Sequence, residues 1–154
     1  MDVRVRCVTI QNEKLLLIHR VRPDLSDDFY FFPGGGVEEG ELPEAACVRE
    51  MYEEVSVTVE PVKLLGIQFH TDRLGDHCQM YYLVDIKEGE IGKGTGDEYT
   101  EALLSTHGTH DPELLSFEEF RDGSIKPGKI SEQLVPHLDN LMQMPFFMLD
   151  ERNI

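Results

Sequence analysis

Three glutamates lie close together in a stretch of the chain that reads PGGGVEEGELPEAACVREMYEEVSV over residues 33–57. If residues 43–55 form a helix, Glu50, Glu53 and Glu54 are three and four residues apart and project from one side of it. Hard cations such as Mg²⁺ prefer oxygen ligands, which clustered carboxylates supply. An acidic helix face exposed to solvent is the alternative, and the helix alone does not decide between the two.

The glycines directly before this helix favour the metal site. Gly34 and Gly35 allow the backbone to turn tightly and to approach a ligand. Pro43 suits the first helical position, and the free N–H groups at a helix N-terminus suit an anion. A cation site beside an anion site is the layout expected for a metal-bound phosphate ester.

The same stretch resembles the signature of the Nudix hydrolase family, which includes the MutT pyrophosphohydrolases. That signature is a glycine, five residues, a glutamate, seven residues, and then Arg-Glu-apolar-any-Glu-Glu-any-Gly-apolar. The chain has Gly35, Glu41 and the run REMYEEVSV over residues 49–57 at these positions. Only Ser56 departs, because the family has glycine there. A serine in the left-handed conformation that ends many helices costs about 1 kcal/mol, and we expect catalysis to be retained.

The resemblance implies an α/β fold, a Nudix-type α/β/α sandwich with a mixed β-sheet between helices. It implies Mg²⁺-dependent hydrolysis of the pyrophosphate bond of a nucleoside diphosphate derivative (NTP, damaged NTP, ADP-ribose or a similar small nucleotide), with Mn²⁺ as a substitute ion. By position, Glu50 and Glu54 are direct metal ligands, and Glu53 binds metal or activates water. A backbone carbonyl near Gly34 completes the set, and Arg49 orients a glutamate of the site.

Other candidates lie outside the acidic helix. Glu98 is the first choice for an additional metal ligand or general base, and a solvated loop residue is the alternative. Arg20 and Arg22 are candidates for contact with substrate phosphate, with surface arginines at a strand end as the alternative. The backbone of Gly34 and Gly35 is expected to bind substrate as well.

Three further residues have weaker roles in this interpretation. Glu41 precedes the helix and is expected to support the site from a loop, with no direct part in the chemistry. His70 and His77 are expected at strand ends near a turn. They have no metal-ligand spacing, so contact with substrate is an alternative to a structural role.

The composition limits the classes of function. The chain has 154 residues and a formal net charge of −16, which disfavours a nucleic acid polymer as partner but allows a small anion held by a local cation. No apolar run is long enough to span a membrane, and the first residues lack the layout of a signal peptide. Cys7, Cys47 and Cys78 form no CxxC pair, which indicates reduced thiols in a cytoplasmic protein.

The domain organisation is expected to be simple. Residues 1–154 are predicted to form a single Nudix hydrolase domain, and a homodimer is an arrangement common in the family. Two classes of function stay open: a hydrolase, which the complete set of signature glutamates favours, and a non-catalytic Nudix-like nucleotide-binding regulatory domain. No motif downstream of the signature names the substrate.

Hydrophobic periodicity predicts the elements that must hold this site. Residues 2–10 and 14–21 are expected to pair as a hairpin, and Gly66 is expected to mark a bulge. One face of the helix is predicted to pack on the sheet: Ala45, Val48, Met51, Tyr52 and Val55. The other predicted elements are strands at 29–32, 62–70, 77–87 and 112–117, a long loop at 88–111, and a C-terminal helix at 131–143 with Ser131 as its N-cap.

Overall fold

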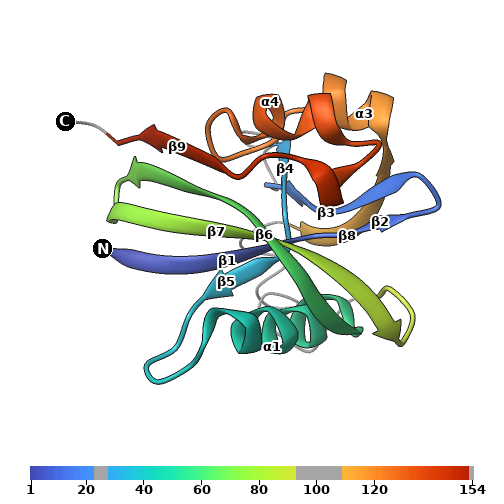
Figure 1. Ribbon diagram of the computed structural model, residues 1–154, viewed down its shortest axis with the longest axis horizontal. Helices are drawn as coiled ribbons and strands as arrows, with labels where there is room; N and C mark the ends of the chain where they lie inside the picture. The colour runs from blue at the N-terminus through green and yellow to red at the C-terminus, as the bar shows by residue number, and fades with distance from the viewer. Residues whose placement is uncertain (23–27, 93–108, 153–154) are drawn as a thin grey trace.

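The computed structural model describes residues 1–22, 28–92 and 109–152 (Figure 1). The strands are β1 (Asp2–Val8), β2 (Ile10–Gln11), β3 (Lys14–Val21), β4 (Asp28–Phe31), β5 (Gly34–Gly36), β6 (Thr58–Asp72), β7 (Gly75–Glu88), β8 (Thr109–Ser116) and β9 (Phe147–Glu151). The helices are α1 (Pro43–Val55), α3 (Phe117–Asp122) and α4 (Ile130–Leu134), with the 3₁₀ helices η2 (Val135–His137) and η3 (Leu141–Gln143). No helix in these ranges has the length and apolar character needed to cross a membrane.

The strands form two sheets. The larger sheet has the order β5-β1-β7-β6-β9 and is mixed, because β1 runs parallel to β7 and β9 runs parallel to β6, while the other pairs are antiparallel. In the smaller, antiparallel sheet, β3 pairs with β2, β4 and β8. Helix α1 lies on one side of the sheets, and α3 and α4 lie on the other (Figure 1). The predicted mixed sheet between helices is therefore confirmed.

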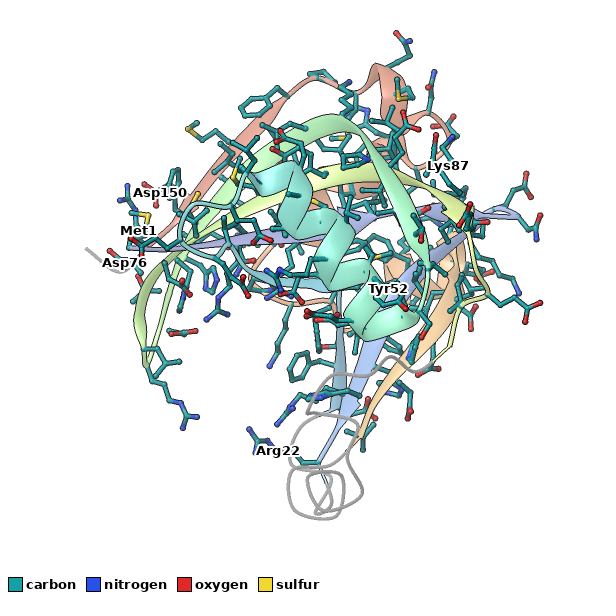
Figure 2. All side chains as sticks on the ribbon, turned by 90° about the horizontal axis from the view of Figure 1, so that it is seen from below. Met1, Arg22, Tyr52, Asp76, Lys87 and Asp150 are labelled. Carbon is teal, nitrogen blue, oxygen red and sulfur yellow. The ribbon has the colours of Figure 1, made fainter. Side chains whose placement is uncertain are left out.

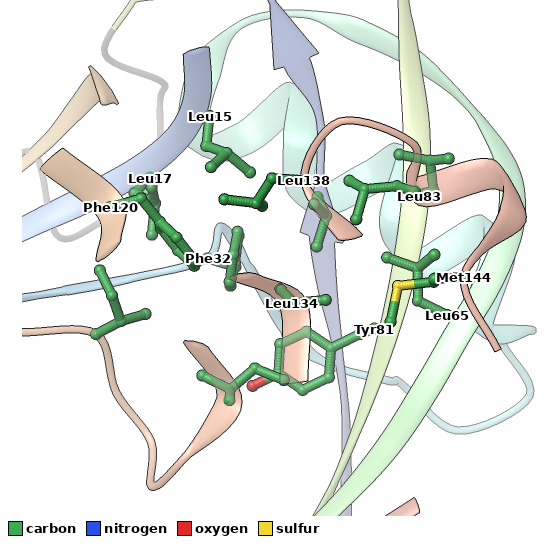
Figure 3. Close-up of a cluster of buried hydrophobic side chains, with 14 of the residues drawn as sticks. Leu15, Leu17, Phe32, Leu65, Tyr81, Leu83, Phe120, Leu134, Leu138 and Met144 are labelled. Carbon is green, nitrogen blue, oxygen red and sulfur yellow. The ribbon is translucent and has the colours of Figure 1, made fainter. Parts of the chain in front are cut away.

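A hydrophobic core fills each side of this arrangement. Alternate residues of β3 point in opposite directions, so Leu16 and Ile18 join the core under α1, while Leu15 and Leu17 join the core on the other side. The second core also contains Phe32, Tyr81, Phe120 and Leu134 (Figure 3). The sequence of β3 contains a continuous apolar run because both faces of this strand are buried.

The predicted hairpin of residues 2–10 and 14–21 is wrong. β1 pairs with β5 and β7 in the larger sheet, and only the short β2 pairs with β3. The chain changes sheets at the buried Thr9, whose carbonyl accepts a hydrogen bond from the backbone N–H of Leu16 at 3.2 Å. A turn after a strand suggests a hairpin, but the partner of each strand depends on residues far along the chain.

The C-terminal region also differs from the predicted helix over residues 131–143. Helix α4 ends at Leu134, Pro136 lies in the 3₁₀ helix η2, and the N-cap is Lys129, not Ser131. Beyond it, β9 adds an edge strand that the sequence pattern did not reveal. The predicted strand at 62–70 is part of the longer β6, whose register shifts beside Pro61 and again beside Gly66, as expected for a bulge.

The buried face of α1 is only partly the predicted one. Met51 and Val55 are buried as expected, but Val48 is 37% exposed and Tyr52 is 61% exposed. Ala46 and Cys47, which the helical wheel grouped with the glutamates, are fully buried instead. The helix is rotated about its axis relative to the prediction, and this rotation brings Glu50 toward the glycines before the helix.

Candidate active site

The glycines preceding α1 form a short strand with little space for side chains. Gly34 has a φ of +150°, and a Cβ on it would lie 2.0 Å from the carbonyl oxygen of Val5 in β1. Gly36 faces open space, so it meets no such obstacle. β5 can therefore lie flat against β1 only with glycine at position 34.

Two glutamates of α1 converge on these glycines. A Cβ on Gly35 would lie 2.5 Å from Oε1 of Glu50, so the absence of a side chain there makes room for that carboxylate. One helical turn further, Glu54 accepts a hydrogen bond through Oε2 from the backbone N–H of Gly34 at 3.3 Å. The structure thus brings together Gly34, Gly35, Glu50 and Glu54, which the sequence predicted to share one site.

Arg49 is the cation at the centre of this acidic cluster. Its guanidinium donates to Glu50 at 2.9 Å, to Glu53 at 3.3 Å and to the carbonyl oxygen of Gly36 at 2.9 Å. It also forms a two-point contact with Glu41 at 2.8 and 3.0 Å. These contacts offset the repulsion among carboxylates on one helix and fix the position of the arginine.

Glu41 connects the loop before α1 to Arg49. Its carboxylate accepts the two Arg49 hydrogen bonds and a third from the backbone N–H of Glu38 at 3.0 Å. Together these hydrogen bonds lower the pKa of Glu41 to about 2. This geometry suits the supporting role expected from the sequence.

The glutamates of the cluster differ in their surroundings. Burial raises the pKa of Glu50, and the Glu53 carboxylate raises it further, while Arg49 and Arg6 oppose that change. The side chain of Glu53 is 45% exposed and is the more open to solvent. Glu50 is therefore the more buried carboxylate, which could hold a cation, and Glu53 is the more accessible to water.

The carboxylates of the cluster are the candidate ligands for a divalent ion. Within the described residues, no three His, Cys, Asp or Glu side chains already stand in a metal-binding arrangement, and Arg49 occupies the space among the carboxylates. The chemistry of the donors nevertheless fits a hard cation, because Glu50 and Glu54 approach the same glycine turn and every candidate donor is an oxygen.

A second region is a pocket of about 640 Å³ that has Arg6 in its lining and is called the basic pocket below. Its lining includes Arg4, Arg6, Arg20 and Lys126, with the aromatic rings of Phe29 and Phe31. The Arg6 guanidinium lies 5.6 Å from the centre of the Phe31 ring, and the Lys126 ammonium lies 4.7 Å from that of Phe29. Aromatic faces beside cations are suited to a ligand with a flat ring and a negative charge.

Arg6 joins this pocket to the acidic cluster. It donates to the carbonyl oxygen of Phe32 at 3.1 Å, two residues before Gly34, and its charge acts on Glu50. The two regions therefore adjoin at Arg6, and the pocket lining also includes the carboxylates of Asp72 and Glu151.

Of the two arginines predicted to contact substrate phosphate, only Arg20 is among the described residues that line the basic pocket. Arg20 lines the basic pocket and contacts His110 of β8. Arg22 follows β3 and is not among the described residues that line the pocket. Figure 2 shows it far from Met1, Asp76 and Asp150. Glu98 lies outside the described residues.

Most residues that line the basic pocket were not predicted from the sequence. Arg4 and Arg6 alternate with buried Val5 and Cys7 in β1, a pattern that marks one face of a strand as polar but not as a binding surface. Lys126 comes from the segment after α3 and has no motif around it. The pocket also includes His70, for which contact with substrate was the alternative interpretation.

Comparison with known proteins identifies the family of the chain. Residues 1–133 match the family model described as the NUDIX domain. Over 39 residues, 25% of the chain, it is 56% identical to an RNA pyrophosphohydrolase from Psychromonas ingrahamii, covering 22% of that protein. Over 85 residues, 55% of the chain, it is 34% identical to diphosphoinositol polyphosphate phosphohydrolase 2 from Mus musculus, covering 46% of it. The chain thus aligns with less than half the length of each of these relatives.

Solved structures share the fold at low sequence identity. A Nudix hydrolase from Nitrosomonas europaea superposes with a TM-score of 0.69 at 16% identity, covering 99% of this chain and 79% of that one. An ADP-ribose pyrophosphatase from Streptococcus suis gives 0.63 at 18% identity, covering 97% and 98%. With a family model that spans most of its length and a carboxylate site at the matching residues, the chain belongs to the Nudix family.

Proposed function

We propose that the protein is a Mg²⁺-dependent hydrolase that cleaves the pyrophosphate bond of a nucleoside diphosphate derivative, such as an NTP, a damaged NTP or ADP-ribose. The convergence of Glu50 and Glu54 on the turn of Gly34 and Gly35 carries this proposal. The adjoining basic and aromatic pocket supports a small nucleotide as the substrate.

The chain's own residues have separable roles in this reaction. Mg²⁺, or Mn²⁺ in its place, would neutralise the oxygens of the pyrophosphate link and lower the pKa of water. Glu50 and Glu54, with the carbonyl of Gly34, would hold the ion. Glu53, the more exposed carboxylate, would accept a proton from the attacking water, and Arg49 would keep the glutamates in position.

The pocket would hold the rest of the substrate. Phe29 and Phe31 offer ring faces for a base, and Arg4, Arg6, Arg20 and Lys126 offer positive charge to phosphate. This local charge counters the formal net charge of −16, which would otherwise repel the substrate. Arg6 would orient the substrate between its base and the bond to be cleaved.

The decisive experiment measures product release from a panel of pyrophosphate compounds. The panel contains NTPs, oxidised NTPs, ADP-ribose and dinucleoside polyphosphates. An RNA and a diphosphoinositol polyphosphate are added because relatives are named an RNA pyrophosphohydrolase and a diphosphoinositol polyphosphate phosphohydrolase. Each compound is tested with Mg²⁺, with Mn²⁺ and with EDTA, using the wild-type protein and the variants Glu53→Gln and Glu54→Gln. Glu60→Gln, which removes an exposed glutamate from β6, is the matched control.

Turnover is expected with the metal ions and not with EDTA. Each of the two α1 variants should lose at least about 100-fold in rate, as is typical when a group that stabilises the transition state is removed. Glu60→Gln should keep its rate. Binding of nucleotides without turnover of any compound would refute the hydrolase and favour the non-catalytic nucleotide-binding domain.

A further inference from the structure

Gln79 is a buried polar residue between the basic pocket and the neighbouring strands. It is 1% exposed and lies in β7, opposite Arg4 of β1 on one side and Gln68 of β6 on the other. Its Oε1 accepts a hydrogen bond from Nε of Arg6 at 2.8 Å. Its Nε2 lies 2.9 Å from Nε2 of His70. One amide group therefore joins two residues of the pocket.

The orientation of this amide follows from the chemistry of its partners. A guanidinium has only N–H donors, so the oxygen of Gln79 must face Arg6. The amide nitrogen must then donate to Nε2 of His70, which can accept only if it carries no proton. His70 is consequently neutral in this arrangement, and its remaining proton is on Nδ1.

We propose that Gln79 is a positioning residue for the substrate pocket: its single amide orients Arg6 and holds His70 as the neutral, Nδ1-protonated imidazole. The role in substrate binding rests on the proposed function, whereas the proton position on His70 does not. Arg6 gains a fixed direction, with Nε held by Gln79 and another nitrogen held by the carbonyl oxygen of Phe32. An arginine fixed in this way loses less conformational freedom when it binds phosphate.

The groups around His70 also favour the neutral form. Burial lowers the pKa of His70, and so do His77, which stacks on it from β7 at 5.0 Å, and Arg4 and Arg6 of β1. Asp72, further along β6, acts in the opposite direction. Glu151 of β9 is the register partner of His70 across the sheet. The net direction is downward.

Protonation of His70 would break the arrangement. A protonated Nε2 would point an N–H at the amide N–H of Gln79. Rotating the amide would satisfy His70 but would turn its NH₂ group toward Nε of Arg6, which is also a donor. The amide satisfies one partner or the other, so acid conditions should weaken the binding of a phosphate ligand by releasing Arg6.

The first test reads the proton on His70 directly. Long-range ¹⁵N–¹H NMR spectra of histidine distinguish the Nδ1–H from the Nε2–H form, and His137, in η2 and outside the pocket lining, provides a reference signal. We expect the Nδ1–H form at pH about 8. In Gln79→Glu, a carboxylate accepts from both neighbours, so the pKa of His70 should rise by about one unit or more. An Nε2–H form, or no rise in that variant, would overturn the proposal whether or not the protein hydrolyses any compound.

The second test measures binding without turnover. Calorimetric titration with ADP in EDTA is carried out at several pH values on the wild type, Gln79→Glu and Gln79→Leu, after thermal unfolding has shown that each variant is folded. Gln79→Leu should bind about tenfold more weakly at neutral pH, because Arg6 loses its acceptor, while Gln79→Glu should stay close to the wild type. Equal affinity of Gln79→Leu and the wild type would overturn the positioning role. If no compound of the panel is turned over, a tenfold difference in ADP binding would still support it.

Discussion

The acidic cluster and the basic pocket are neighbours, but they are built in opposite ways. Within the part of the chain that the structure describes, the groups of the cluster come from one stretch: Gly34 to Gly36, Glu41 and α1. The pocket draws on β1, β3, β4, β6, β7, β8, β9 and the segment around Lys126. A site made from one turn and one helix leaves a pattern in the sequence, whereas a site made across two sheets leaves only scattered residues.

The largest effect is expected from closing the space that Gly35 leaves for Glu50. In Gly35→Ala, the new Cβ would meet the Glu50 carboxylate at 2.5 Å and displace it. We expect a loss of about 100-fold in kcat/KM, in line with the cost of misplacing a group by about 1 Å. Gly36→Ala is the matched control, because a Cβ there meets nothing within 4 Å. Equal losses in the two variants would show that the cluster does not depend on this close approach.

Arg6→Ala addresses the boundary between the two regions. It removes the cation that contacts Phe32, Gln79 and Phe31, and KM should rise about tenfold, which corresponds to about 1.4 kcal/mol of binding free energy. The effect on kcat should be smaller, because the carboxylates stay in place. Steady-state kinetics on the best compound of the panel measure both. Arg73→Ala, in the exposed turn between β6 and β7, should change neither.

Ser56 offers a test of the one departure from the family signature. It lies at the C-cap of α1 with φ +63° and ψ +30°, where a side chain is strained and glycine is not. Ser56→Gly should raise the free energy of unfolding by less than about 1 kcal/mol. Thermal or urea unfolding measures the change. Ser56→Ala keeps the strain, so a gain of the same size in that variant would point to another cause.

Substitution of His19 in β3 tests how much the stability of the smaller sheet depends on ion pairs between its strands. Burial lowers its pKa, but contacts with Asp28 and Glu113 raise it more, so the net shift is upward from 6.5. A raised pKa stabilises the folded state below the unfolded value and loses that effect as pH rises through the folded pKa. His19→Gln should therefore lower Tm slightly more at pH about 5.5 than at about 8.5. A loss that is independent of pH would contradict these ion pairs.

The features that could be predicted are those that depend on residues close together in the sequence. The spacing of Glu41, Arg49, Glu50 and Glu54 located the acidic cluster, and Pro43 and Gly66 marked a helix start and a bulge. The helical wheel failed for Val48 and Tyr52, because Ala46 and Cys47 face the core under α1 in their place.

The features that could not be predicted depend on the pairing of strands that are far apart in the sequence. β1 was assigned to the wrong partner because its neighbours, β5 and β7, lie far along the chain. The same holds for Arg6 and Gln79, whose hydrogen bond joins residues 73 positions apart. Nothing near either residue indicates the other, so the pocket becomes visible only when the strands are paired.

The hydrogen bonds of Arg49 also affect the stability of α1. The single positive charge of Arg49 lies among the carboxylates of Glu41, Glu50 and Glu53, so it reduces the repulsion that these groups would otherwise exert on α1. Because these contacts hold the helix through the chain's own residues, a chelator should lower the melting temperature only slightly even if it abolishes the proposed hydrolysis.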